Sequence, residues 1–187
     1  MKDAGEIVKN GGIIIFPTDT ALGIGCRIDN PEAVQRVFTI RRRPATLPMP
    51  VLVSSSDMAL AYYFNASDVV RRLMSDYWPG ALTIVATCNM NCIDSPIRAG
   101  GETVGLRMPN HPAILKIIEE VGVPILGPSA NFHGGPTPYS SHDLDPELVK
   151  LVDYVVPGEC TLRRASTVVD CSVNPYKIIR QGAVMLK

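Results

Sequence analysis

The sequence lacks the short motifs that mark the commonest nucleotide-binding and hydrolytic enzymes. It contains no GxxxxGKS/T phosphate-binding loop and no GxGxxG dinucleotide fingerprint. It also contains no GxSxG nucleophile elbow and no HExxH zinc pair. These absences weigh against a P-loop ATPase, a dinucleotide-dependent dehydrogenase, a serine hydrolase and a zinc peptidase. A nucleotide site in this chain would have to be built from side-chain cations and hydroxyls.

Cysteines are few and carry no metal-binding pattern. Cys26, Cys88, Cys92, Cys160 and Cys171 form an odd set without a CxxC pair. Two of them are four residues apart, but no second pair with zinc-ligand spacing exists elsewhere in the chain. We therefore expect idle or buried thiols in a reducing cytosol, and no metal held by protein ligands.

Long apolar runs and an excess of charge of one sign are also missing. No apolar stretch approaches the roughly 20 residues that span a bilayer, and the N-terminal MKDAGEIVKNGG has no apolar signal segment. We expect a cytoplasmic protein without a membrane span. Because 18 basic and 18 acidic residues cancel, an anion site must be a local gathering of arginines. Zero net charge and few aromatic side chains also weigh against a protein that coats nucleic acid.

The composition and the order of apolar segments predict one α/β (α+β) domain over residues 1–187, with helices packed on a mixed sheet. Strands alternate with helices early in the chain and bunch together late. Helices are expected at residues 3–10, from 31 into the arginines, at 67–77, 111–121 and 146–151. Strands are expected at 13–16, 51–53, 81–87, 103–108, 123–126, 154–156, 167–169, 177–180 and 183–186, with a loop at 18–25.

Three consecutive arginines, Arg41, Arg42 and Arg43, end the second expected helix and precede Pro44. Arginine keeps its charge and offers phosphate oxygens a planar fork of donors, so the cluster is a candidate phosphate clamp. The alternative is that the arginines only complement the partial charge of a helix C-terminus. Nearly ninety residues later the segment GPSAN at 127–131 supplies small hydroxyl and amide groups. The two segments together suit a polyanion bound beside a small polar molecule.

Several further motifs occur in a fixed order. They are PTDT at 17–20 with GIG at 23–25, RRRP at 41–44, WPG at 78–80 with a threonine at 83, VGLRMPNHP at 104–112, PSAN at 128–131, STVVD at 166–170 and IRQG at 179–182. Each motif is weak alone, but the ordered set covers almost the whole chain. It resembles the YrdC-like threonylcarbamoyl-AMP synthases, also called TsaC.

The resemblance implies a reaction, a fold and partners. L-threonine, bicarbonate and ATP, with Mg²⁺ arriving on the nucleotide, would give L-threonylcarbamoyladenylate and pyrophosphate. The adenylate would then pass to the machinery that transfers the threonylcarbamoyl group to tRNA adenosine. The implied YrdC-like fold is an open, twisted mixed sheet around a basic concave cavity. Such a reaction needs positioning and neutralisation of charge, and no protein nucleophile.

The resemblance also implies roles for nine residues. Those matching the family's catalytic motif pairs are Arg41, Arg43, Ser129 and Asn131. Those expected at ATP are Arg43, Thr103, Asn131 and Arg180. Those expected at L-threonine are Thr20, Arg107, Ser129 and Ser166, with Arg107 gripping the carboxylate through both terminal nitrogens. Without the resemblance, a surface ion pair would explain Arg107, and turn or loop hydrogen bonds would explain the hydroxyl and amide residues.

Four departures from the family pattern keep other readings open. Arg41 stands where lysine is usual, Leu47 where asparagine or lysine is usual, and Leu52 and Tyr139 replace a more polar residue and a threonine. The alternative is a divergent or non-catalytic YrdC-like protein that binds RNA or nucleotide, and contact with tRNA or double-stranded RNA fits either reading. A third reading is a relative acting on another carbamoyl compound, as in hydrogenase maturation proteins of similar fold. Their chains are far longer, and we expect no extra C-terminal domain after Lys187.

Overall fold

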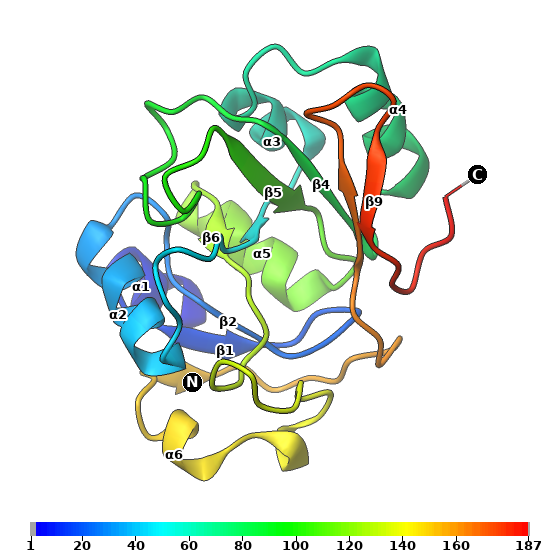
Figure 1. The fold of residues 1–187 in the computed structure, drawn as a ribbon. Coiled ribbons are helices and arrows are strands. Elements are labelled where there is room, and N and C mark those ends of the chain that lie inside the picture. Colours follow the sequence, from blue (N-terminus) through cyan, green and yellow to red (C-terminus); the bar gives the residue numbers. More distant parts are fainter. Residues whose placement is uncertain (1–2, 187) are drawn as a thin grey trace.

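In the computed structural model, which describes residues 3–186, the strands form two separate mixed sheets (Figure 1). In the smaller sheet, β1 (Ile14–Phe16) lies between β2 (Gly23–Gly25), which is antiparallel to it, and β7 (Tyr154–Val155), which is parallel. The larger sheet has the order β6-β3-β5-β4-β8-β9. Its strands are β3 (Val51–Leu52), β4 (Leu82–Thr87), β5 (Thr103–Arg107), β6 (Ile125–Leu126), β8 (Thr167–Asp170) and β9 (Lys177–Arg180). The predicted fold class is confirmed, with the strands divided between two sheets.

The helices begin at residues that suit a helix N-terminus. They are α1 (Ala4–Lys9), α2 (Pro31–Arg41), α3 (Ser56–Tyr62), α4 (Asp68–Tyr77), α5 (Pro112–Val121), α6 (Pro146–Val149) and the 3-10 helix η1 (Ser141–Asp143). The Asn30 side chain caps α2 by accepting from the N–H of Ala33, and Pro31 takes the first helical position. Helix α2 ends at Arg41 and is followed by its C-cap residue Arg42, whose φ of 52° is left-handed. The predicted helix running into the arginines is confirmed. Within residues 3–186, no helix has both the length and the apolar character needed to cross a membrane.

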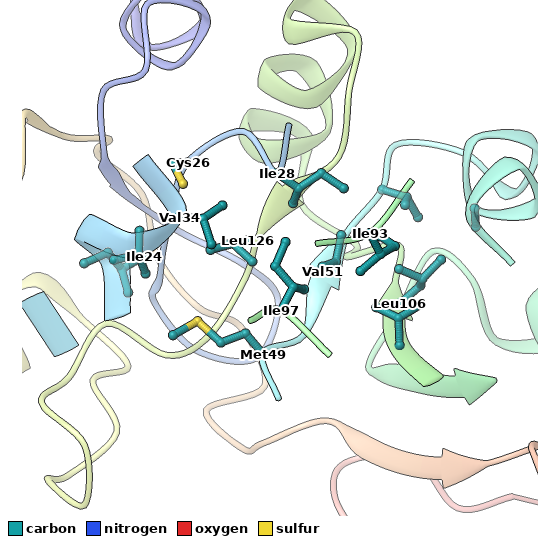
Figure 2. Close-up of a cluster of buried hydrophobic side chains, with 14 of the residues drawn as sticks. Ile24, Cys26, Ile28, Val34, Met49, Val51, Ile93, Ile97, Leu106 and Leu126 are labelled. Carbon is teal, nitrogen blue, oxygen red and sulfur yellow. The ribbon is translucent and has the colours of Figure 1, made fainter. Parts of the chain in front are cut away.

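The apolar run at residues 13–16 forms a strand buried on both faces, as predicted. Ile13 and Ile15 pack into the main core, whereas Ile14 and Phe16 face a second cluster that includes side chains of α1 and α5. This alternation follows from the two-residue period of a strand. The main core joins both sheets, because Ile24 of β2 lies in the same cluster as Val51 and Leu106 of the larger sheet (Figure 2).

Three sequence predictions were wrong. Residues 18–25 were expected to be a loop, but 23–25 pair with β1, since tertiary pairing overrides the weak strand preference of glycine. Helix α3 was not expected, although Ser55 caps it by accepting from the N–H of Met58. Residues 183–186 do not form the expected strand, because the Thr167 hydroxyl takes up the Val184 N–H in place of a backbone ladder.

The two sheets meet along β2, which runs beside residues 126–130. The N–H of Ile24 donates to the carbonyl of Pro128 (2.9 Å), and the N–H of Ala130 donates to the carbonyl of Leu22 (2.8 Å). Gly25 allows this approach, because a Cβ there would lie 1.8 Å from the carbonyl oxygen of Leu126. The PTDT and PSAN motifs are therefore brought side by side.

Replacing Gly25 by alanine tests this seam. We expect the free energy of unfolding to fall by about 1–3 kcal/mol or more, because backbone must move away from the added methyl group. Urea denaturation of the variant measures the change. The control is Gly101→Ala, where the nearest atom to the new Cβ is 3.3 Å away. Equal stability of the two variants would contradict the account of the seam.

Candidate functional site

A cavity of about 360 Å³ lies between one face of the larger sheet and the seam of β2 with residues 127–129. Eight of the nine predicted site residues line it: Thr20, Arg41, Arg43, Thr103, Arg107, Ser129, Ser166 and Arg180. The ninth, Asn131, is not in the cavity wall, but its side chain is hydrogen-bonded to Ser129 and Arg41. The fold therefore gathers residues from six separate stretches of sequence around one cavity.

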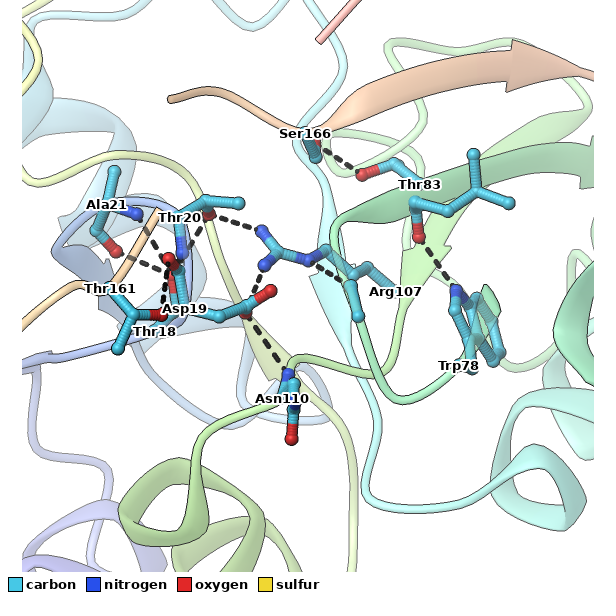
Figure 3. A network of polar contacts seen from close by, with 12 residues as sticks. Thr18, Asp19, Thr20, Ala21, Trp78, Thr83, Arg107, Asn110, Thr161 and Ser166 are labelled. Carbon is cyan, nitrogen blue, oxygen red and sulfur yellow. Dashed lines mark hydrogen bonds and ion pairs between the residues drawn. The ribbon is translucent and has the colours of Figure 1, made fainter. Parts of the chain in front are cut away.

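Arg107 is the centre of a buried polar network (Figure 3). Its guanidinium forms an ion pair with Asp19, donates from Nη1 to the hydroxyl of Thr20 (2.6 Å) and donates from Nε to the carbonyl of Gly80 (2.9 Å). Both charged side chains are more than nine-tenths buried. Burial lowers the pKa of Arg107, and the Asp19 carboxylate opposes that effect. Each terminal nitrogen uses one of its two N–H groups in these contacts, so within residues 3–186 one N–H on each is left for a ligand.

The Thr20 hydroxyl has a fixed direction of hydrogen bonding. Thr18 Oγ1 donates its single proton to the carbonyl of Ala21 (2.7 Å). In the 3.0 Å contact between the two hydroxyls, Thr20 must therefore be the donor and Thr18 the acceptor. Because Thr20 Oγ1 also accepts from Arg107, only a lone pair remains for a ligand. This position therefore offers an acceptor for an N–H or O–H group.

Arg41 and Ser129 share Asn131 as a partner. Arg41 donates from Nε to the Asn131 carbonyl and from Nη2 to Asn131 Oδ1, each at 3.2 Å, and Ser129 Oγ donates to the same Oδ1 at 2.6 Å. Arg41 is 3% exposed, and its Nη1 is buried without a hydrogen-bond partner among the described residues. Burial and the nearby charge of Arg43 lower the pKa of Arg41 to about 10, so it stays cationic at neutral pH. An anion in the cavity would satisfy Nη1.

Arg43 and Arg180 are held mainly by oxygen atoms of the wall. Arg43 donates from Nη2 to the carbonyl of Pro48 (2.8 Å), and Arg180 donates from Nε to the Ser166 carbonyl and from Nη2 to the Ser166 hydroxyl, both at 3.0 Å. Burial lowers the pKa of each. The Ser166 hydroxyl also lies 2.9 Å from that of Thr83. The lining contains no Asp or Glu among the described residues, so this half of the cavity suits an anion.

Arg41, one of the four residues that depart from the family pattern, lies in the cavity wall as described above, and the other three take different places. Leu47 is 37% exposed and gives its backbone carbonyl to Arg43 Nε at 3.4 Å. Leu52 lies in the cavity wall and packs against Gly127. Tyr139 lies outside the wall, where its N–H donates to Asp143. None of the three places a polar side chain in the cavity.

The sequence did not identify Asp19 as a site residue. Asp19 and Arg107 are 88 residues apart, so no local spacing could link them, and Asp19 stood out only as an acid within the PTDT motif. Across residues 3–186, no three His, Cys, Asp or Glu side chains gather as a candidate metal site.

Comparisons with known proteins show the family of the chain. Residues 6–182 match the profile of the Sua5/YciO/YrdC family, which is described as "Telomere recombination". The chain is similar to threonylcarbamoyl-AMP synthase of Bacillus subtilis, with 32% identity over 185 residues that cover 97% of this chain and 53% of that protein.

Among solved structures, it is similar to Sua5 of P. abyssi complexed with L-threonine, with a TM-score of 0.91, 31% identity, and coverage of 96% of this chain and 53% of that one. It is also similar to E. coli YciO, with a TM-score of 0.85, 27% identity, and coverage of 96% and 87%. The chain therefore spans about half the length of the first synthases it matches, and most of YciO.

Removing the Asp19 carboxylate tests how Arg107 is held. In Asp19→Ala, we expect the free energy of unfolding to fall by about 3–5 kcal/mol, because Arg107 becomes a buried cation without its counter-ion. The control is Asp29→Ala, which breaks a more exposed pair with Arg27 and should cost less than about 1 kcal/mol. Urea denaturation measures both. Similar losses in the two variants would show that the Arg107 pair is not the support described above.

Proposed function

This chain belongs to the Sua5/YciO/YrdC family, and on that premise we propose that it is an L-threonylcarbamoyladenylate synthase. Its substrates would be L-threonine, bicarbonate or CO₂, and ATP, and its products threonylcarbamoyl-AMP and pyrophosphate. In enzyme class it would be a nucleotidyltransferase. We assign this function to a single domain comprising residues 1–187.

The proposed chemistry needs no protein nucleophile. The neutral threonine amine adds to the carbon of CO₂, one C=O π bond opens onto oxygen, and the nitrogen releases one proton to solvent, which gives a carbamate. With bicarbonate as the source, the same carbamate forms and one water is released. A carbamate oxygen then attacks the α-phosphorus of ATP. The new P–O bond forms as the bond to the β-phosphate bridge breaks, and pyrophosphate leaves with the electron pair. The protein would hold the reactants in line and stabilise the developing negative charge.

The observation that carries the proposal is the convergence of Arg41, Arg43 and Arg180 on one cavity, where Arg41 Nη1 is buried and has no hydrogen-bond partner in the described part of the chain. A triphosphate supplies the oxygens that such a donor set requires. We assign these arginines to the phosphates, and Thr103, which lies in the same wall, to the rest of the nucleotide. Asn131 would contribute by orienting Arg41 and Ser129.

L-threonine would lie at the hydroxyl-rich part of the cavity, against Thr20, Ser129 and Ser166. Ser129 donates its proton to Asn131, and Thr20 donates its proton to Thr18, so both offer lone pairs to an amine N–H. The L-threonine bound in P. abyssi Sua5 makes the same amino acid a natural candidate here. We place Arg107 at this end, where it orients Thr20 and can offer its remaining terminal N–H groups to the threonine carboxylate.

Further partners follow from the proposed reaction. Mg²⁺ would arrive with ATP as part of the substrate. The adenylate would be consumed by the machinery that transfers threonylcarbamoyl groups to tRNA, and direct contact with tRNA belongs to the same proposal. Because ATP, threonine and tRNA meet in the cytoplasm, we propose that the reaction takes place there.

Pyrophosphate release from ATP tests the function. We expect release that depends on both threonine and bicarbonate, and a loss of about 10²–10³-fold in kcat/KM for Arg43→Ala, since a phosphate-binding cation is removed. The matched control is Arg71→Ala on α4, because Arg71 is exposed and lies outside the cavity wall. Release that is equal with and without threonine, or equal in the two variants, would contradict the proposal.

A further inference from the structure

The three consecutive arginines at the end of α2 each contact one of three consecutive residues, which begin with the asparagine of the PSAN motif. The pairs are Arg41 with Asn131 (Nη2 to Oδ1, 3.2 Å), Arg42 stacked over the Phe132 ring (4.2 Å to its centroid), and Arg43 with His133 (Nη1 to Nδ1, 3.4 Å). The backbone adds a bond from the His133 N–H to the Arg41 carbonyl (2.8 Å). The sequence motifs account for the first pair only.

Within residues 3–186, the contacts of Arg43 leave two of its donors without a partner. A guanidinium carries five N–H groups. Nε donates to the carbonyl of Leu47, one N–H of Nη2 donates to the carbonyl of Pro48, and one N–H of Nη1 donates to His133. One N–H therefore remains on each terminal nitrogen. Because all three nitrogens are held, the plane of the guanidinium is fixed before any ligand binds.

The direction of the contact with His133 follows from the chemistry of arginine. A guanidinium has no lone pair to offer, so Arg43 Nη1 donates and His133 Nδ1 accepts. The side chain of His133 is exposed, and the residue belongs to neither apolar cluster of the core. Its most specific contact is thus the one with a cavity arginine.

We propose that His133 is a positioning residue for the phosphate half of the cavity, acting through Arg43. By accepting from Nη1, it holds the guanidinium so that the two remaining N–H groups meet two oxygens of a di- or triphosphate. The inference deepens the proposed function and rests on it only in taking ATP as the natural ligand. Because the long Arg43 side chain is already ordered, binding a ligand costs less conformational entropy. This raises the affinity for the ligand about 3- to 10-fold.

Calorimetric titration of the full chain with inorganic pyrophosphate and with ATP tests the proposal. We expect His133→Ala to raise both dissociation constants about 3- to 10-fold and to leave that of threonine unchanged. His133→Asn should restore affinity to within about 2-fold, because its Oδ1 lies near the place of Nδ1 and accepts the same bond. His142→Ala, at an exposed histidine of η1, is the matched control and should bind as the wild type does.

A double-mutant cycle separates this role from general damage to the fold. In an Arg43→Ala background, His133→Ala should cause no further loss of pyrophosphate affinity. Unchanged pyrophosphate affinity in the single variant, an equal loss in the alanine and asparagine variants, or a full additional loss in the Arg43→Ala background would each overturn the inference. If no threonylcarbamoyl adenylate forms while the pyrophosphate differences persist, the proposed function fails and the role of His133 stands.

Discussion

The structure depends on keeping four guanidinium groups charged in the wall of one cavity. Removing a cation from water is costly, and burial lowers the pKa of each of these arginines. The fold offsets the cost with a different partner for each: the Asp19 carboxylate for Arg107, Asn131 for Arg41, backbone carbonyls for Arg43, and Ser166 for Arg180. The hydroxyl and amide residues of the site therefore take their orientation from the arginines.

The backbone makes this arrangement possible by bringing the two sheets together at β2. The close approach of Gly25 to Leu126 places the PTDT loop beside residues 127–131, and the end of α2 joins them through the contacts of Arg41. The binding residues thus lie at a junction of strands, loops and a helix end, where side chains from distant segments can point into the same space.

Local signals in the sequence predicted much of the fold. The run at 13–16 and the Asn30-Pro31 helix start are strong signals because one short stretch determines each. Strand β2 depends on tertiary pairing, and α3 has only 7 residues in which a helical pattern could show. Ordered motifs also selected eight residues that line the cavity. What they could not predict is which side chains contact each other. Asp19 with Arg107 and Arg43 with His133 are 88 and 90 residues apart, and only the folded chain brings them into contact.

The central claim is that Arg41, Arg43 and Arg180 bind one triphosphate next to an amino acid. A crystal structure of the chain with L-threonine and a non-hydrolysable ATP analogue tests it most directly. The account predicts phosphate oxygens about 3 Å from Arg41 Nη1 and from free donors of Arg43 and Arg180, with the threonine amine at Thr20. A triphosphate bound elsewhere, with Arg41 Nη1 still lacking an anion, would contradict it.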